Sequence, residues 1–265
     1  MAQRPQRADP GLGACTLNVG RGGLTPARLG AVLNWAEGSP FHVFFLQECR
    51  GTESPFHTAR KQHSAELSWR GHWFFEPGTA HSKGCLMLLK PTPHLQNPVQ
   101  VACPHPEARG RVLRVDAMLA GRPTSLVCVY APAEPAQRPL FYAQVLPECL
   151  PAPDERLVLM GGDFNCITAV HDYCQPWAQR AEQRVAEAGA ERLRQLMAGE
   201  GEAPRLVDSW RRLHPQRVDV THHSAARHTG ARVDRWLLSP ELDAWVVEAE
   251  VQPLRPVATD HMQQC

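Results

Sequence analysis

The sequence predicts an α/β domain, because segments with helical spacing alternate along the chain with short apolar segments of strand length. Residues 25–38 have the pattern of an amphipathic helix and lead directly into the apolar segment 41–47. Another apolar segment, residues 156–160, stops at a double glycine. The chain has 265 residues, of which 43% are hydrophobic and 21% charged, so it can bury the core of one large domain or two small ones.

The first third of the chain predicts two helices and three strands. Thr25 followed by Pro26 has the pattern of a helix start, and the helical spacing continues to residue 38. The segment 41–47 is continuously apolar and rich in strand-forming residues, so we expect a strand that is buried on both faces. The further elements expected here are a helix over residues 54–67 and strands at 72–75 and 85–89.

The rest of the chain predicts more strands and two longer helices. Residues 113–119 alternate apolar and polar side chains and residues 125–130 are apolar, which together predict an antiparallel pair. A helix over residues 137–150 is expected before the strand 156–160. The remaining expected elements are a solvated helix over residues 178–197, a short element at 208–210, a loop rich in His and Arg up to residue 230, and strands at 231–238 and 245–251.

Charge and cysteine content exclude several classes of protein. Lys and Arg (28) balance Asp and Glu (27), which leaves a net charge of +1, so any nucleic-acid surface must be a local patch. We expect this patch in residues 21–28 and 214–232, with Arg21, Arg227 and Arg232 as DNA contacts. The nine cysteines form no CxxC pair and several lie in apolar segments, which favours reduced thiols and an intracellular protein. There is no segment of signal-peptide type and no run of about 18 apolar residues, so we expect no membrane partner.

Chemically active side chains follow the apolar strands at four places. They are Glu48, Asp163 with Asn165, Asp234, and Asp260 with His261. Asp163 and Asn165 are two positions apart and share one side of an extended chain, although a turn stabilised locally by Asp and Asn would have the same sequence. His261 is of the type that titrates near neutral pH, and Asp234 is available to orient its imidazole. Carboxylates and amides favour a hard cation, so we expect Mg²⁺.

Six motifs occur in the order found in the endonuclease/exonuclease/phosphatase family, which the chain resembles from about residue 14 to residue 261. They are LNVGRGGL with Asn18, FLQE with Glu48, VYAPA with Tyr130, GDFN with Asp163 and Asn165, ARVDRWLLS with Asp234, and TDH with Asp260 and His261. Within that family the sequence looks most like the endonuclease domain of non-LTR (LINE-type) retrotransposons, through YAPA, GGDFNC, DSWRRLHP, VTHHS and RVDRWLLSPEL. Two positions depart from the family pattern. Gly20 stands where many members carry an acidic residue, and Val220 stands where an aromatic residue usually precedes the threonine.

The resemblance implies a four-layered α/β sandwich of two packed mixed β-sheets flanked by helices, with the site at one end where their loops meet. By similarity, Glu48 would bind Mg²⁺, with Asn18 near it and Asp260 assisting. Mn²⁺ is expected to substitute for Mg²⁺. Thr221 matches a phosphate-contacting threonine of the family.

The resemblance also implies the catalytic roles. Asp163 would activate the attacking water, and Asn165 would hold the phosphate. Tyr130 would support the phosphate and the transition state. His261, oriented by Asp234, would contact the scissile phosphate. A phosphodiester is anionic, so a metal ion and an imidazolium are suited to neutralise its charge while an aligned water attacks.

The function that the resemblance implies is a Mg²⁺-dependent phosphodiesterase that nicks one strand of DNA and leaves 3′-hydroxyl and 5′-phosphate ends. The alternatives are an abasic-site endonuclease or a small-molecule phosphatase of the same fold, or a catalytically inactive DNA-binding remnant. A reverse-transcriptase segment does not fit within the chain, so this partner would be supplied separately. A protein that acts on chromosomal DNA would be nuclear.

The expected domain organisation is a flexible tail over residues 1–13 and a single domain over residues 14–265. In the family, the segment that corresponds to residues 259–261 leads into a final strand. The following residues, MQQC, are few and polar, so we expect the domain to be truncated at its last strand.

Overall fold

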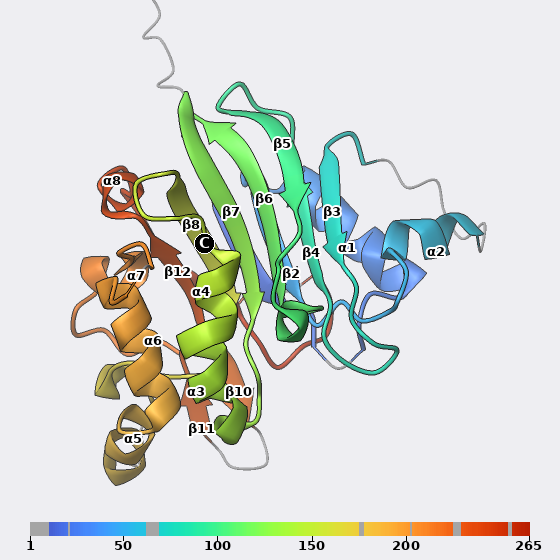
Figure 1. Cartoon of the computed structure of the whole chain (residues 1–265). Helices are drawn as coiled ribbons and strands as arrows, with labels where there is room; N and C mark the ends of the chain where they lie inside the picture. Colours follow the sequence, from blue (N-terminus) through green and yellow to red (C-terminus); the bar gives the residue numbers. More distant parts are fainter. Residues whose placement is uncertain are drawn as a thin grey trace, which may run out of the picture.

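Two six-stranded sheets pack face to face, with helices on their outer faces and a two-stranded hairpin in addition (Figure 1). The structure is a computed structural model, and it describes residues 11–20, 22–61, 69–174, 178–201, 203–224, 229–253 and 256–265.

The first sheet has the order β13-β14-β1-β2-β4-β3. Its strands are β1 (Ala14–Asn18), β2 (Val43–Gln47), β3 (His72–Glu76), β4 (Cys85–Leu89), β13 (Val251–Gln252) and β14 (Gln263–Gln264). β1 and β2 run parallel, whereas the other neighbouring pairs of this sheet are antiparallel.

The second sheet repeats this arrangement in the order β5-β6-β7-β8-β12-β9. Its strands are β5 (Leu95–Val101), β6 (Val112–Leu119), β7 (Arg122–Tyr130), β8 (Leu157–Asp163), β9 (Val207–Asp208) and β12 (Asp234–Leu238). Here β7 and β8 form the parallel pair, and the other neighbours are antiparallel. The hairpin consists of β10 (His222–Ser224) and β11 (Thr229–Ala231).

Helices cover both outer faces of the sheets. They are α1 (Pro26–Gly38), α2 (Pro55–Lys61), α3 (Arg138–Leu140), α4 (Leu146–Cys149), α5 (Ala178–Val185), α6 (Ala188–Ala198), α7 (Ser209–Leu213) and α8 (Pro240–Asp243). A π-helical segment, Phe141–Val145, joins α3 to α4, and short 3₁₀ turns lie at Pro106–Ala108, Pro135–Gln137 and Val170–Asp172. Figure 1 shows α1 and α2 on one side of the two sheets and α4 and α6 on the other. The predicted helix over residues 178–197 is interrupted between α5 and α6.

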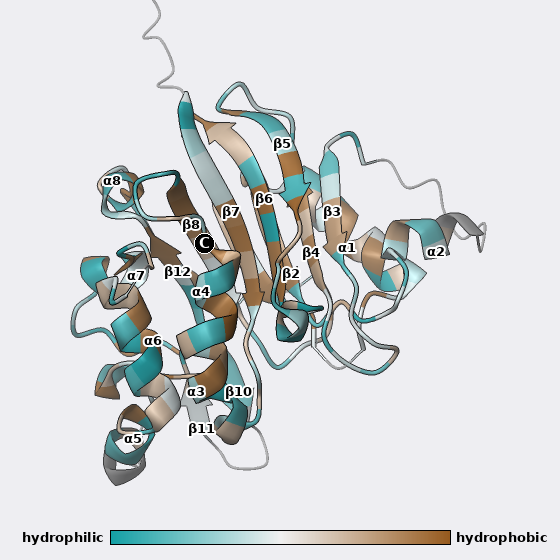
Figure 2. Ribbon diagram, viewed as in Figure 1, coloured by the Kyte–Doolittle hydropathy of each residue, from teal (hydrophilic) through white to brown (hydrophobic). Residues whose placement is uncertain are grey.

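Alternate residues of the central strands face opposite layers. In β2, Phe44 and Leu46 pack with α1, whereas Val43 and Phe45 lie in the core between the two sheets. β7 alternates in the same way between the helices and the other sheet. Figure 2 shows β7 as polar to neutral at its start and hydrophobic toward its C-terminal end. The predicted strand that is buried on both faces is therefore confirmed, and so is the four-layered α/β sandwich.

Several strand expectations differ from the structure. The loop expected up to residue 230 contains the hairpin of β10 and β11. The strand expected at residues 245–251 is wrong, since only Val251–Gln252 is a strand and Val247 is 93% exposed. β5 was not expected, because its sequence LQNPVQV contains a proline and mostly exposed residues. A strand at the edge of a sheet tolerates such a sequence, because one side of its backbone does not need sheet partners.

The C-terminal residues form an interior strand, although they are few and polar. β14 lies between β13 and β1, and Gln264 is in register with Thr16 of β1. Both glutamines of β14 are fully buried, and the indole Nε1 of Trp236 donates a hydrogen bond to the carbonyl oxygen of Gln264 (3.1 Å). Pairing on both sides satisfies the backbone of even this short polar segment.

The beginning of the described chain is part of the fold. Residues 1–10 of the expected flexible tail lie outside the described residues. Leu12 packs against the core between the sheets, and the carbonyl oxygen of Gly13 accepts hydrogen bonds from the backbone of His42 and Val43. The tail expected over residues 1–13 therefore does not include these two residues. Among the described helices, none is long and apolar enough to cross a membrane.

Candidate active site

Five of the predicted site residues come together at one end of the two sheets. Asn18 ends β1 beside the end of β2, after which Glu48 follows. Tyr130 and Asp163 are in register at the ends of the parallel strands β7 and β8. Asp234 begins the antiparallel strand β12 opposite Asp163. The carboxyl ends of parallel strands meet at one edge of a sheet, and this explains why motifs far apart in the sequence converge here.

Glu48 is held in an unusual conformation at the end of β2. Its φ of 57° lies in the left-handed region, which costs a non-glycine residue free energy and is found most often at functional sites. Its carboxylate Oε1 accepts hydrogen bonds from the Asn18 amide and the Tyr130 hydroxyl, both at 3.1 Å. Burial and then the charge of Glu48 raise the pKa of Tyr130 far above its usual value, so the phenol stays protonated and donates.

The fully buried Asn18 joins the two carboxylates of the site. Its Nδ2 donates to Oε1 of Glu48 (3.1 Å) and to Oδ2 of Asp163 (2.9 Å). Its Oδ1 accepts a hydrogen bond from the backbone of Gly20 (2.8 Å). The oxygen that could bind a metal is therefore engaged, and Asn18 positions Glu48 and Asp163.

Asp163 is almost completely buried, with 1% of its surface exposed. Burial and then the carboxylate of Asp234 raise the pKa of Asp163 to about 7, although His261 opposes the rise. A carboxylate with this pKa can accept a proton near neutral pH. The preceding Gly162 has a φ of 144°, and a Cβ there would lie 2.0 Å from the carbonyl oxygen of Val129, so the second glycine of the motif is needed for the close approach of β7.

Asn165 donates hydrogen bonds to both oxygens of the Asp163 carboxylate. Its backbone N–H donates to Oδ1 of Asp163 (2.8 Å), and its Nδ2 donates to Oδ2 (3.2 Å) and to the carbonyl oxygen of Ala131 (3.0 Å). The φ of Asn165 is 48°, again in the left-handed region. The Asx turn that the sequence left open is therefore present, and it orients the general-base candidate.

His261 and Asp234 form a buried ion pair next to Asp163. Nδ1 of His261 lies 2.9 Å from Oδ2 of Asp234, and its Nε2 lies 3.9 Å from Oδ2 of Asp163. Burial favours the neutral imidazole, but Asp234 outweighs it with help from Asp163, and the pKa of His261 rises to about 9. The imidazolium therefore predominates at neutral pH, and its Nε2 faces the proposed base.

Asp260 lies apart from Glu48 and close to a residue that sequence reasoning missed. Its Oδ2 is 3.4 Å from Nε2 of His222, and its side chain is 48% exposed. Among the described residues, two groups of three His, Cys, Asp or Glu side chains could hold a metal ion. One is His222 with Asp260 and His261, the other is Asp163 with Asp234 and His261, and neither includes Glu48. His222 adjoins Thr221 in the VTHHS motif, so this motif was the available signal.

Thr221 holds the backbone that carries Asp234. It is fully buried, and its Oγ1 accepts hydrogen bonds from the backbone of Val233 and Asp234, both at 3.0 Å. The expected phosphate contact is therefore wrong for this residue, because its hydroxyl positions Asp234 within the fold.

Arg232 is also not at the surface, and the expected DNA contact is wrong. Its guanidinium is fully buried between Asp172 and Asp208, at 2.9 Å and 2.7 Å. Arg235 is buried against the same two carboxylates, at 2.9 Å and 2.8 Å. Arg211 adds a further contact to Asp172. Arg21 and Arg227, the other expected DNA contacts, lie outside the described residues.

This buried ion network explains several motifs that sequence reasoning assigned to no structural role. Asp208 of DSW also caps α7 through the backbone N–H of Arg211 (3.0 Å). The two arginines of RVDR flank Asp234, so the network anchors the start of β12. The motif pattern thus contains both candidate catalytic charges and structural charges, and the structural charges are those paired with one another inside the fold.

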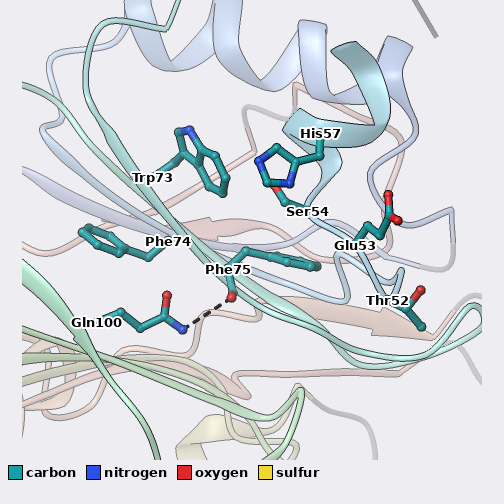
Figure 3. Close-up of a pocket in the computed structure, with 8 residues that line it drawn as sticks. All are labelled: Thr52, Glu53, Ser54, His57, Trp73, Phe74, Phe75 and Gln100. Carbon is teal, nitrogen blue, oxygen red and sulfur yellow. Dashed lines mark hydrogen bonds between the residues drawn. The ribbon is translucent and has the colours of Figure 1, made fainter. Parts of the chain in front are cut away.

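A pocket of about 480 Å³ lies elsewhere, between α2 and β3 (Figure 3). Its lining residues are Thr52, Glu53, Ser54, His57, Trp73, Phe74, Phe75 and Gln100. Figure 3 shows the amide of Gln100 donating to the carbonyl oxygen of Phe75. None of the predicted site residues lines this pocket.

Comparison with known proteins identifies the family. The sequence pattern of the Endonuclease/Exonuclease/phosphatase family matches residues 15–261. The chain belongs to this family. The converging motifs described above are therefore those of an endonuclease/exonuclease/phosphatase domain, and the resemblance stated from the sequence is confirmed.

Individual relatives agree with this assignment. The chain is 27% identical over 235 residues to the Xenopus laevis protein "Transposon TX1 uncharacterized 149 kDa protein", and the match covers 87% of this chain but only 16% of that protein. The fold is similar to that of an AP endonuclease from Archaeoglobus fulgidus, with a TM-score of 0.69, 17% identity and coverage of 96% of this chain and 97% of that one. It is also similar to the Neisseria 3′ phosphatase NExo bound to product DNA hairpin, with a TM-score of 0.64, 20% identity and coverage of 96% and 98%.

Proposed function

We propose that this chain is a Mg²⁺-dependent endonuclease of retrotransposon type that nicks one strand of DNA and leaves 3′-hydroxyl and 5′-phosphate ends. The observation that carries the proposal is the continuous hydrogen-bonded network from Glu48 through Asn18 to Asp163, beside the His261–Asp234 ion pair. It combines a metal-ligand candidate, a general-base candidate and a cation at one solvent-facing end of the fold.

Glu48 has the donor chemistry that Mg²⁺ requires. Mg²⁺ binds oxygen and commonly takes one or two carboxylates, completing its coordination with waters and substrate phosphates. The carboxylate of Glu48 is fixed by two donors and is only partly buried. The bound ion would supply positive charge to the phosphate, and Mn²⁺ has similar ligand preferences. Asp260, which sits beside His222, would not share this ligand role with Glu48 directly.

Asp163 is the proposed general base. A water molecule forms the new bond to phosphorus while Oδ of Asp163 takes its proton, and the bond from phosphorus to the 3′ oxygen breaks. The leaving 3′ oxygen gains a proton from solvent and becomes the 3′-hydroxyl. The Asp163 carboxyl then returns its proton to solvent. Asn165 and Asn18 keep the carboxylate in one orientation throughout.

His261 and Tyr130 would stabilise the negative charge that grows on the phosphate. His261 is protonated because of Asp234, and its Nε2 points toward the region of Asp163 where the water would attack. Tyr130 keeps its proton and donates a hydrogen bond to Glu48, which would hold the metal. These preformed donors need little reorganisation during the reaction, and this is the main source of electrostatic catalysis. Asn165 would donate its amide to the phosphate when substrate displaces one of its present contacts.

DNA as substrate is supported by the similarity to a transposon protein. With a net charge of +1, affinity must come from a local basic patch, and Arg21 and Arg227 remain the proposed contacts. A reverse transcriptase supplied by another chain or another segment would use the 3′-hydroxyl end as a primer. This role places the protein in the nucleus when the target is chromosomal DNA.

The first test is plasmid nicking. Purified protein with supercoiled plasmid and Mg²⁺ should produce open circles, and chelation with EDTA should stop the reaction. Glu48→Ala and Asp163→Ala should each reduce the rate by roughly a hundredfold or more, because metal binding or water activation contributes roughly 3 kcal/mol or more to transition-state stabilisation. Glu37→Ala, which removes an exposed carboxylate of α1, is the matched control and should keep the wild-type rate.

Two further substrates separate the related functions. An oligonucleotide with an abasic site that is cut much faster than intact plasmid would replace the proposal with abasic-site cleavage. Phosphate release from a phosphoinositide, without plasmid nicking, would replace it with small-molecule phosphatase activity. Near wild-type nicking by Glu48→Ala or Asp163→Ala would remove the proposed mechanism.

A further inference from the structure

A second group of metal-ligand types lies on the solvent side of His261. The group contains His222 and Asp260 with His261, and one ligand atom from each of the three residues lies within 4.8 Å of the others. It contains two imidazoles and one carboxylate, in contrast to the oxygen-rich surroundings of Glu48. Two imidazoles favour a transition metal such as Zn²⁺ over Mg²⁺.

The backbone fixes the three residues relative to one another. Residues 221–223 pair with residues 260–262 through hydrogen bonds from His223 N–H to the Asp260 carbonyl oxygen (3.0 Å) and from Met262 N–H to the Thr221 carbonyl oxygen (2.6 Å). His222 and His261 form a bridge in this pairing, and their ring centroids are 4.7 Å apart. The backbone pairing therefore holds the three residues close to one another.

The spacing between His222 and Asp260 suits a tetrahedral ion. Two ligands that each lie about 2.1 Å from a tetrahedral zinc ion are about 3.4 Å apart. Nε2 of His222 and Oδ2 of Asp260 are 3.4 Å apart, too far for a strong hydrogen bond. The side chains of His222 and Asp260 are 34% and 48% exposed, so an ion can enter from solvent.

His261 offers its other nitrogen to this group. Its Nδ1 is paired with Asp234 at 2.9 Å, so the nitrogen available to an ion is Nε2, which lies 3.9 Å from Oδ2 of Asp163. A carboxylate on the second nitrogen of a metal-binding histidine fixes the ring and makes it a better ligand. Asp234 therefore has the arrangement that is usual behind the histidines of zinc sites.

We propose that His222, Asp260 and His261 form a transition-metal site, suited to Zn²⁺, with one coordination position left to water. Since the site takes Nε2 of His261, an ion bound there withdraws the imidazole from the phosphate and inhibits nicking. The inhibition rests on the proposed function, whereas metal binding does not.

Binding is tested with Co²⁺ as the probe, because its visible absorption reports the ligands. The wild-type protein should develop the d–d bands of a tetrahedral site of nitrogen and oxygen ligands, without the near-ultraviolet charge-transfer band of thiolate ligands. His222→Ala and Asp260→Asn should weaken Co²⁺ binding by roughly tenfold or more, and Zn²⁺ should displace Co²⁺ from the wild type.

His223→Ala is the matched control. His223 is exposed, and neighbouring residues of a strand point to opposite faces, so its side chain lies away from the cluster. This variant should bind Co²⁺ as the wild type does. Absent bands, thiolate bands alone, or equal titrations of His222→Ala and His223→Ala would each overturn the site.

Inhibition is tested separately in Mg²⁺ buffer. Zn²⁺ should inhibit the wild type and His223→Ala at similar concentrations, and His222→Ala should require roughly tenfold more, each measured against its own rate without Zn²⁺. Equal inhibition of all three variants would overturn the competition for His261. If no variant nicks DNA at all, the proposed function fails, and the Co²⁺ titration still decides the metal site.

Discussion

At the scale of single residues, the site combines a candidate base and a cation whose pKa values are both shifted by burial and by the charge of Asp234. Asp163 must be deprotonated to accept a proton, and its pKa is about 7. His261 must be protonated to stabilise the phosphate, and its pKa is about 9. The rate of nicking should therefore rise as the pH increases through about 7 and fall above about 9, which pH profiles of kcat/KM would measure.

Asp234→Asn gives the check on this pH profile. Loss of its charge removes what holds the pKa of His261 high, so the alkaline limb should move to lower pH. The same loss removes a repulsive neighbour of Asp163, so the acid limb should move in the same direction. An alkaline limb that stays in place would assign that limb to another group.

The candidate catalytic residues could be predicted from motifs. Whether a charged residue belongs to the site or to the fold could not, because this depends on the partners that it meets in the folded chain. Asn18, Glu48 and Asp163 were expected together, and the structure brings them within hydrogen-bonding distance. Arg232 was expected on DNA because it lies in a basic segment, yet its charge is neutralised by acids from distant elements. A one-dimensional pattern cannot show which arginine finds a carboxylate on another strand.

At the scale of elements, the buried ion network should be important for stability. Arg232→Ala leaves Asp172 and Asp208 with an uncompensated charge inside the protein, so it should lower the free energy of unfolding by roughly 3 to 5 kcal/mol. Arg217→Ala is the matched control, because this side chain is 44% exposed and its ion pairs should contribute only about 0 to 1 kcal/mol. Urea denaturation monitored by tryptophan fluorescence measures both, and similar losses would show that the network contributes no more than surface pairs.

The strand β14 should couple stability to activity. A variant that ends after Met262 leaves β1 and β13 without their common partner and removes the Trp236 contact, so melting temperature and nicking should fall together. Cys265→Ala, which keeps the strand, is the control. Unchanged melting of the shortened variant would mean that β14 contributes little to the sheet.

The helices and strands show where a local sequence pattern is sufficient to predict secondary structure. The helix that begins after Thr25 and the strand Val43–Gln47 carry clear signals, and both are present. β14 consists of two glutamines, whose local preference does not favour a strand, and pairing with residues far away in the chain decides its structure. The edge strand Leu95–Val101 escaped detection for a related reason, since its exposed side chains carry no apolar pattern.

At the scale of the whole molecule, the net charge of +1 means that DNA affinity must come from a few local contacts. The loss of one of them should therefore change the salt dependence of binding. Arg227→Ala should weaken binding to all sequences and reduce the slope of log K against log salt concentration by about one, because each lost phosphate contact removes about one released counterion. A substitution that removes no phosphate contact should leave the salt dependence unchanged. Arg232→Ala, measured at a temperature where the variant is folded, is therefore the control. Equal slopes for wild type and Arg227→Ala would place the DNA surface elsewhere.

The order of motifs predicted the fold better than any single motif did. Each sheet contributes one central pair of parallel strands, and polar residues lie at the ends of these strands. The alternation of apolar segments with polar residues at their ends therefore predicts the α/β architecture. The pairing of the two sheets and the long-range contacts of β14 are not local properties, and only the family resemblance supplied the four layers.

The adjacency of β1 and β14 has a consequence for how such a domain can be combined with others. Thr16 and Gln264 are register partners on antiparallel neighbouring strands, which lie about 5 Å apart, so the chain enters and leaves the fold at almost the same point. That point lies at the end of the sheet opposite Asn18 and His261. A larger polypeptide can therefore carry the domain as an insertion in one of its surface loops, with the two flanking segments kept side by side and the active end directed outward.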